Sequence, residues 1–117
     1  MKRTPASIPP KLRRELTERL QAHAQERWKE RCARVEVRFR GRYAQVDAYE
    51  YDPESPEKVE SVPTHLCRLE YAGHPDIWGF AFYKYSTERY ERSFLPSGSM
   101  GGTPEECFDC AGLAYLR

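Results

Sequence analysis

Residues 33–51 read ARVEVRFRGRYAQVDAYEY, and this stretch decides the fold because apolar and polar side chains alternate on both sides of Gly41-Arg42. Such alternation is typical of strands that turn one face toward a core. Gly41 can supply the positive φ that a two-residue type II′ turn requires. The stretch therefore predicts an antiparallel hairpin.

The turn also fixes which residues face each other across the hairpin. The inward pairs are apolar, and they are Phe39 with Ala44, Val37 with Val46, and Val35 with Ala48. The outward pairs are polar or aromatic, and they are Arg40 with Tyr43, Arg38 with Gln45, Glu36 with Asp47, and Arg34 with Tyr49. The hairpin thus predicts a sheet with one apolar face and one face rich in arginine and tyrosine.

The same two-residue period predicts three more strands, at about residues 65–71, 77–85 and 90–95. In the first of them, one face is expected to carry Cys67, Leu69 and Tyr71, and the other Leu66, Arg68 and Glu70. In the second, one face is expected to carry Trp78, Phe80 and Phe82, and the other Ala81, Tyr83 and Tyr85. The expected pairs between the last two strands are Lys84 with Glu91, Tyr83 with Arg92, and Tyr85 with Tyr90.

A helix is predicted from Lys11 to about Arg27, because apolar residues recur there every four positions and Pro9-Pro10 fits a helix start. The recurring residues are Leu12, Leu16, Leu20 and Ala24. The first turn is cationic, with Lys11, Arg13 and Arg14, which is the wrong sign for the helix dipole. These cations are either tolerated at small cost or used by a partner.

A second helix is predicted over Pro104–Tyr115. Thr103 suits the N-cap, Pro104 the first helical position, and Glu106 completes a capping box. The face that we expect to be buried carries Cys107, Cys110, Ala111 and Ala114, flanked by Phe108 and Tyr115.

Together these elements predict an α+β fold with an N-terminal helix, a five-stranded, mainly antiparallel sheet and a C-terminal helix, both helices packed on one sheet face. An alternative places one helix on each face, which would cover the outward tyrosines. The 117 residues suit a single domain over 1–117, with residues 1–8 as a flexible tail and the acidic, proline-rich residues 52–63 as an exposed loop.

No stretch approaches the roughly 20 apolar residues of a membrane span, and residues 1–16 lack the apolar core of a secretion signal. We therefore expect a cytoplasmic protein without a membrane partner. In that compartment the four cysteines are expected to be free thiols or metal ligands rather than disulfides.

Charge is unevenly distributed along the chain. Residues 1–42 carry 13 Lys/Arg against 5 Glu, whereas residues 43–117 carry 6 Lys/Arg against 13 Asp/Glu. This asymmetry indicates either a surface for an acidic partner or two halves that neutralise each other once folded. The 14 arginines against 5 lysines suit recognition of carboxylate or phosphate, although codon bias in a GC-rich genome gives the same excess.

The outward face of the sheet is the main candidate site. The predicted partner-binding residues are Arg34, Arg38, Arg40, Tyr43, Gln45, Tyr49, Tyr83, Tyr85 and Arg92, joined by Tyr90. Tyrosine and arginine are enriched at protein interfaces, and the same pair binds single-stranded nucleic acid by stacking and phosphate contacts. The plain alternative is a solvated face whose arginines neutralise Glu36 and Asp47. We favour a small non-enzymatic binding module whose partner is a protein or a second copy, with nucleic acid as the weaker possibility.

The competing hypothesis is a metal- or thiol-dependent enzyme, or a zinc protein, centred on Cys107-x-x-Cys110 with Cys67 and His65 as further ligands. The order of these residues is loosely similar to the zinc deaminases, but Cys67 stands where their catalytic glutamate would be and Pro104 is displaced by two positions. One CxxC pair supplies two of four zinc ligands, so burial of the cysteines in the core is the favoured interpretation. No catalytic residue and no cofactor is predicted from the sequence.

Overall fold

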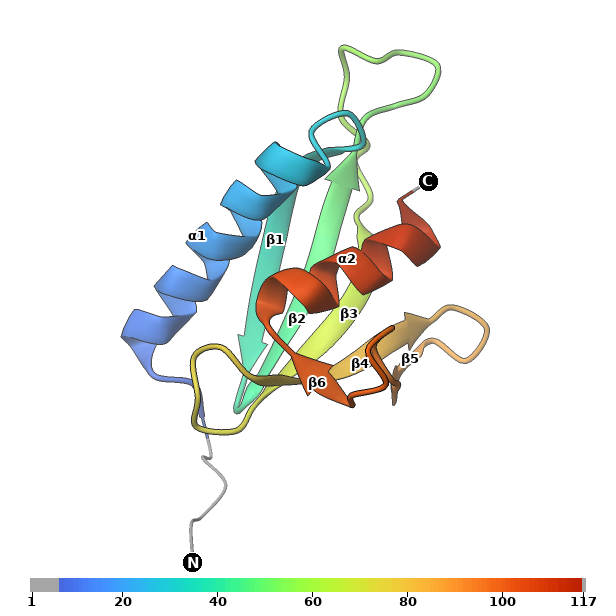
Figure 1. The fold of residues 1–117 in the computed structure, drawn as a ribbon. Helices are drawn as coiled ribbons and strands as arrows, with labels where there is room; N and C mark the ends of the chain where they lie inside the picture. Colours follow the sequence, from blue (N-terminus) through green and yellow to red (C-terminus); the bar gives the residue numbers. More distant parts are fainter. Residues whose placement is uncertain (1–6, 117) are drawn as a thin grey trace, which may run out of the picture.

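A computed structural model describes residues 7–116 of the chain, and Figure 1 shows its path. The elements in chain order are α1 (Pro10–Arg27), β1 (Cys32–Arg40), β2 (Tyr43–Glu50), β3 (Thr64–Tyr71), β4 (Trp78–Lys84), β5 (Arg89–Arg92), β6 (Gly101–Gly102) and α2 (Pro104–Tyr115). The predicted α+β class is confirmed. The short strand β6 was not predicted.

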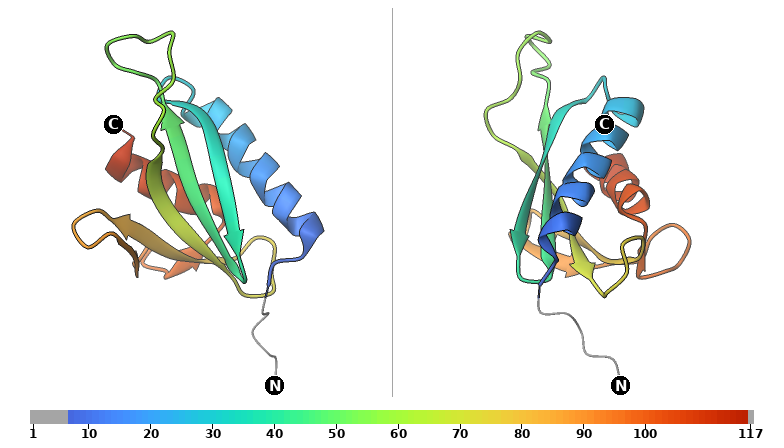
Figure 2. Two further views of the ribbon diagram at one scale, coloured as in Figure 1. Left: turned by 180° about the vertical axis from the view of Figure 1, so that it is seen from behind. Right: turned by 90° about the vertical axis from the view of Figure 1, so that its left-hand side faces the viewer.

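The sheet is antiparallel and its strands lie in chain order, β1-β2-β3-β4-β5, with β6 paired to β4 at Trp78 and Gly79. Both helices lie on the same face, α1 over β1 and α2 over β3, as the two views of Figure 2 show. The alternative with one helix on each face is therefore wrong. The opposite face of the sheet has no helix on it.

The hairpin of β1 and β2 has the predicted register at all seven pairs, from Arg34 with Tyr49 to Arg40 with Tyr43. Gly41 has a φ of 59°, the positive value that the turn requires. The inward residues Ala44, Val46 and Ala48 are fully buried against the helices. This register sends every second side chain of both strands to the face without helices.

Helix α1 packs through its predicted stripe, in which Leu16, Leu20 and Ala24 are buried. The expected tail lies mostly in residues 1–6, outside the described residues. Ile8, however, is fully buried and its N–H donates a hydrogen bond to the Gly41 carbonyl at 3.1 Å. The predicted tail is therefore wrong at Ile8, because this apolar side chain closes the lower end of the core.

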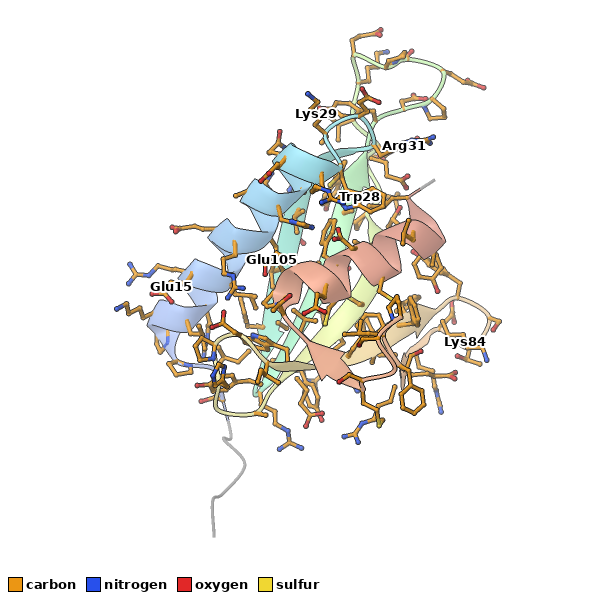
Figure 3. All side chains as sticks on the ribbon, viewed as in Figure 1. Glu15, Trp28, Lys29, Arg31, Lys84 and Glu105 are labelled. Carbon is orange, nitrogen blue, oxygen red and sulfur yellow. The ribbon has the colours of Figure 1, made fainter. Side chains whose placement is uncertain are left out.

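Helix α2 has the predicted bounds and the predicted capping box between Thr103 and Glu106. Its buried face is rotated from the predicted one: Phe108 and Gly112 are buried, whereas Ala114 is exposed. The rotation follows from the contact with Trp28, the C-cap residue of α1, whose ring lies against Gly112. Figure 3 shows Trp28 beside α2. A glycine lets the indole ring approach the helix backbone closely.

Two details of the strands differ from the prediction. A β-bulge between β2 and β3 places Leu66 in the core beside Cys67, not on the outward face. Between β4 and β5 the observed pairs are Tyr83 with Tyr90 and Lys84 with Arg89, two residues away from the predicted register. The faces are unchanged by this shift because the side-chain period of a strand is two.

Residues 52–63 form the predicted exposed loop, apart from a single bridge between Tyr51 and Val59. Among the described residues, no helix is both long and apolar enough to cross a membrane.

Candidate functional site: the open sheet face

The face of the sheet that no helix covers is called the open face. Strand pairing assigns to it Arg34, Glu36, Arg38, Arg40, Tyr43, Gln45, Asp47, Tyr49, His65, Arg68, Glu70, Gly79, Ala81, Tyr83, Tyr90 and Arg92. Figure 2 shows its strands in front of both helices in the view from behind. All but one of the predicted partner-binding residues thus share one surface; the exception is Tyr85.

Tyr85 lies just beyond the end of β4 and reaches around the end of the sheet. Its hydroxyl accepts a hydrogen bond from the His65 N–H at 2.7 Å. Its ring packs against Tyr83 on the open face and Tyr115 of α2, at centroid distances of 4.8 and 5.6 Å. Tyr85 therefore joins the rim of the open face to the helix layer.

Asp47 is the centre of a polar cluster on the open face. Its side chain is 2% exposed, and one oxygen accepts from the Arg38 guanidinium at 3.1 Å. The other oxygen lies 2.8 Å from His65 Nδ1. The bulge at Leu66 explains this contact, because it turns His65 to the open face directly opposite Asp47. Arg38 is thus committed to an internal ion pair.

Arg68 occupies the middle of the open face between two tyrosine rings. Its guanidinium carbon lies 4.3 Å from the ring centre of Tyr43 and 5.6 Å from that of Tyr90. Among residues 7–116 it has no acidic partner, and its buried Nε has no hydrogen-bond acceptor. The rings hold the cation by their negative faces and leave its charge uncompensated.

Tyr90 also lacks a hydrogen-bond partner, since its hydroxyl is buried and unpaired within the described part of the chain. Burial raises the pKa of Tyr90 to about 12. The phenol therefore keeps its proton well above physiological pH.

The remaining open-face arginines differ in how far they are neutralised. Arg92 bonds Glu70 at 3.2 Å, and Arg34 lies 3.9 Å from Glu36 with its guanidinium 3.8 Å above the Tyr49 ring. Arg40 is exposed and forms no ion pair with any residue that the structure describes. Arg40 and Arg68 are thus the two arginines of the face without a carboxylate.

A shallow hollow of about 320 Å³ lies at one end of the open face, where Gly79 and Ala81 carry almost no side chain. Arg68, Glu70, Arg92 and Met100 are among its walls. Phe80, Ala72 and Tyr71 line it as well, so the hollow suits a side chain with both apolar and polar atoms.

The cysteines lie on the helix side of the sheet, so the sheet separates them from His65, the other metal ligand of the alternative hypothesis. Cys67 and Cys107 are fully buried in the core, whereas His65 lies on the open face. Within residues 7–116 there is no group of three or more His, Cys, Asp and Glu side chains that could hold a metal ion. The proposed set of Cys107, Cys110, Cys67 and His65 is therefore not brought together.

Burial also makes the thiols poor nucleophiles. It raises the pKa of Cys107 to about 12 and that of Cys32 to about 11, and it raises the pKa of Cys67 and Cys110 as well. These thiols are protonated at neutral pH, which disfavours thiol catalysis.

The sequence analysis did not predict the role of Arg68 or the contact between Asp47 and His65. Arg68 was assigned to the outward side of its strand but not to the site, because its ring contacts come from two other strands. The adjacent apolar residues Leu66 and Cys67 break the alternation, and this break is the signal that could have predicted the bulge. Comparisons of the chain with protein-family models, with curated proteins and with solved structures gave no match.

Proposed function

We propose that the protein is a non-enzymatic binding module that holds a protein partner on its open face, with Arg68 and its tyrosine neighbours at the centre. The observation that carries this proposal is the guanidinium of Arg68, held between two rings on an uncovered surface without an acidic partner. A preorganised arginine amid tyrosines is typical of the centre of a protein interface. The hollow beside it can accept a side chain of the partner.

The charges of the open face favour a protein over nucleic acid. Three of its five strand arginines lie beside carboxylates, namely Arg34, Arg38 and Arg92. Nucleic-acid binding depends on several cations that are free to neutralise phosphates. With two such arginines, and with Glu36, Asp47 and Glu70 on the same face, the surface suits mixed polar contacts with a protein.

The test is a quantitative capture experiment with Arg68→Met as the key variant. Methionine keeps most of the volume between the rings but removes the charge, so the fold is expected to persist. Tagged wild-type protein and a double variant that combines Arg68→Met with Arg40→Glu are compared by mass spectrometry of the bound proteins. We expect partners held by the wild type to be lost from the double variant.

The matched control is Arg89→Glu, because Arg89 is an exposed arginine of β5 whose side chain is on the opposite side of the strand from Tyr90 and Arg92. Its capture is expected to equal that of the wild type. Unchanged capture by the double variant would reject the open face as the site. Steep, salt-dependent binding of a single-stranded oligonucleotide by the wild type would favour nucleic acid instead.

A second copy of the chain is the other protein partner that this face could accept. Light scattering of the wild type and of Arg68→Met distinguishes this case, since a dimer held by the open face becomes a monomer in the variant.

A further inference from the structure

Strand β1 forms one edge of the sheet, and the chain closes this edge at both ends. Gln21 Oε1 accepts a hydrogen bond from the Val35 N–H at 2.8 Å, and Gln25 Nε2 donates one to the Ala33 carbonyl at 3.1 Å. At the hairpin turn, the Gly41 carbonyl accepts from the Ile8 N–H. Backbone groups that would otherwise be free at a sheet edge are thus paired near the two ends of β1.

Between these closures lies an open window at Val37 and Phe39. Alternate residues of a strand direct their N–H and C=O groups to the same side, and Val35 directs its N–H away from β2. Val37 and Phe39 therefore present four backbone groups to the outside. No hydrogen-bond partner for these groups is found within residues 7–116.

A groove of about 250 Å³ runs beside the window, lined by Arg13, Arg14, Thr17, Glu18 and Phe39. Its lining residues come from the first half of α1 and the end of β1. These two segments diverge toward the hairpin turn in Figure 1 and Figure 2. Arg13 is held in place there: its Nε donates to the Ile8 carbonyl at 2.9 Å, and its guanidinium carbon is 6.0 Å from the centre of the Phe39 ring. The helix side of the groove thus carries two arginines against one carboxylate, that of Glu18.

We propose that this window binds an extended, acidic peptide segment of a partner protein, which adds to β1 as a further strand. Main-chain hydrogen bonds to Val37 and Phe39 supply affinity, as in other cases of strand addition. Carboxylates of the segment meet Arg13 and Arg14, which outnumber Glu18, the acidic residue of the groove lining. This surface is separate from the open face and does not depend on the function proposed for it.

A second copy of β1 is the competing occupant of the window. Antiparallel pairing of two windows about their centre places Arg38 opposite Arg38 of the other copy, which is unfavourable, but it also places Glu36 opposite Arg40 twice, which is favourable. The oligomeric state in solution therefore decides between a second copy and an acidic segment.

The probe is an acetylated, amidated heptapeptide that alternates glutamate and valine, added to the isotope-labelled full chain and followed by NMR. We expect the amide signals of Val37 and Phe39 to shift and their hydrogen exchange to slow. A matched peptide with lysine in place of glutamate is expected to bind about tenfold more weakly. Alternate amides of the peptide can be N-methylated in two ways, at the odd or at the even positions. We expect only the pattern that methylates the amides facing β1 to abolish binding, because it removes the donors that pair with β1.

Two variants locate the interaction. Val37→Pro removes an outward N–H at an edge position where proline is tolerated, and it is expected to abolish binding. Arg14→Glu is expected to lower the affinity about tenfold, whereas Arg89→Glu leaves it unchanged. The N-methylated peptides test the same bonds without altering the protein, in case Val37→Pro does not fold.

Equal binding of the glutamate and lysine peptides would overturn the proposal, as would signal shifts confined to Tyr83 and Tyr90. A dimer in light scattering that Val37→Pro dissociates would show that a second copy occupies the window, which also overturns it.

Discussion

Asp47 is 1% exposed, although it lies on the face of the sheet that no helix covers. Removing a carboxylate from water is costly unless hydrogen-bond partners replace the water, and here the Arg38 guanidinium and the His65 ring do so. At the residue scale, then, not every arginine of the open face is available for binding. Arg38 stabilises the sheet, whereas Arg40, two residues away, forms no ion pair with residues 7–116.

Stability measurements separate these two arginines. We expect Arg38→Glu to lower the free energy of unfolding by about 2–4 kcal/mol, because a second carboxylate would face the buried Asp47. Arg40→Glu is expected to change it by less than about 0.5 kcal/mol, as exposed substitutions usually do. Urea denaturation followed by circular dichroism measures both values, and equal effects of the two changes would contradict the assignment of Arg38.

At the scale of elements, the contact between α1 and α2 depends on Gly112. A Cβ at this position would lie 2.7 Å from Trp28 Cζ2, closer than atoms of a packed core approach. The indole cannot move aside freely, because its Nε1 donates to Asp109 at 2.8 Å and its ring contacts Phe108. A glycine inside a helix, which usually costs stability, is here the residue that lets two helices meet.

Gly112→Ala is therefore expected to destabilise the protein by about 1–3 kcal/mol, although alanine favours a helix by about 1 kcal/mol at most positions. The matched control is Ala114→Gly in the same helix, where the exposed side chain makes propensity the main effect and a loss of about 0.5–1 kcal/mol is expected. Thermal unfolding measures both. A higher melting temperature for Gly112→Ala would show that Trp28 does not restrict this position.

The elements also show where sequence reasoning succeeds. The hairpin register was predictable because a two-residue turn and a strict alternation leave one consistent pairing. The start of α2 was predictable because a capping box is formed by residues that are close in the sequence. The register of β4 and β5 was not predictable from the sequence. The loop between these strands contains Glu88 with a φ of 53°, and a glutamate gives no indication of a positive φ. Arg68 and Asp47 acquire their roles from neighbours on other strands, so no local pattern announces them.

At the scale of the whole molecule, the basic first part of the chain is joined to the acidic second part by specific ion pairs. Arg19 of α1 binds both oxygens of Glu105 in α2, at 2.6 and 2.9 Å, and Asp76 in the turn before β4 at 2.9 Å. Figure 3 shows Glu105 at the side of α2 that faces α1. Some of the basic residues of the first part and acidic residues of the second part thus form ion pairs that hold the two helices together.

The ion pair between Arg19 and Glu105 predicts a dependence of stability on pH. Burial raises the pKa of Glu105, but the hydrogen bond and charge of Arg19 outweigh burial, so the pKa lies below its ordinary value of 4.5. A lowered pKa in the folded state stabilises the protein above about pH 4.5, and this contribution is lost as the pH falls through the folded-state value. We expect Arg19→Met to cost about 1 kcal/mol at pH 7 and much less near pH 3.

Chemical denaturation at a series of pH values tests this expectation. Lys11→Met is the control, because Lys11 pairs with Glu15 at the surface at 3.9 Å and its removal is expected to have almost no effect at any pH. If Arg19→Met lowers the free energy of unfolding equally at pH 3 and pH 7, Arg19 stabilises the protein through packing and not through its ion pair with the ionised Glu105.

Helix α2 follows every long strand in the chain, yet it covers the apolar side of β3. During synthesis on the ribosome, the strands therefore emerge before the layer that shields them, and their inner surface stays uncovered until the last helix leaves the exit tunnel. Such nascent chains are natural clients for chaperones that hold exposed apolar surface. Ribosomes stalled before residue 104 should accordingly retain more of a ribosome-associated chaperone than ribosomes stalled after a linker that exposes the whole helix.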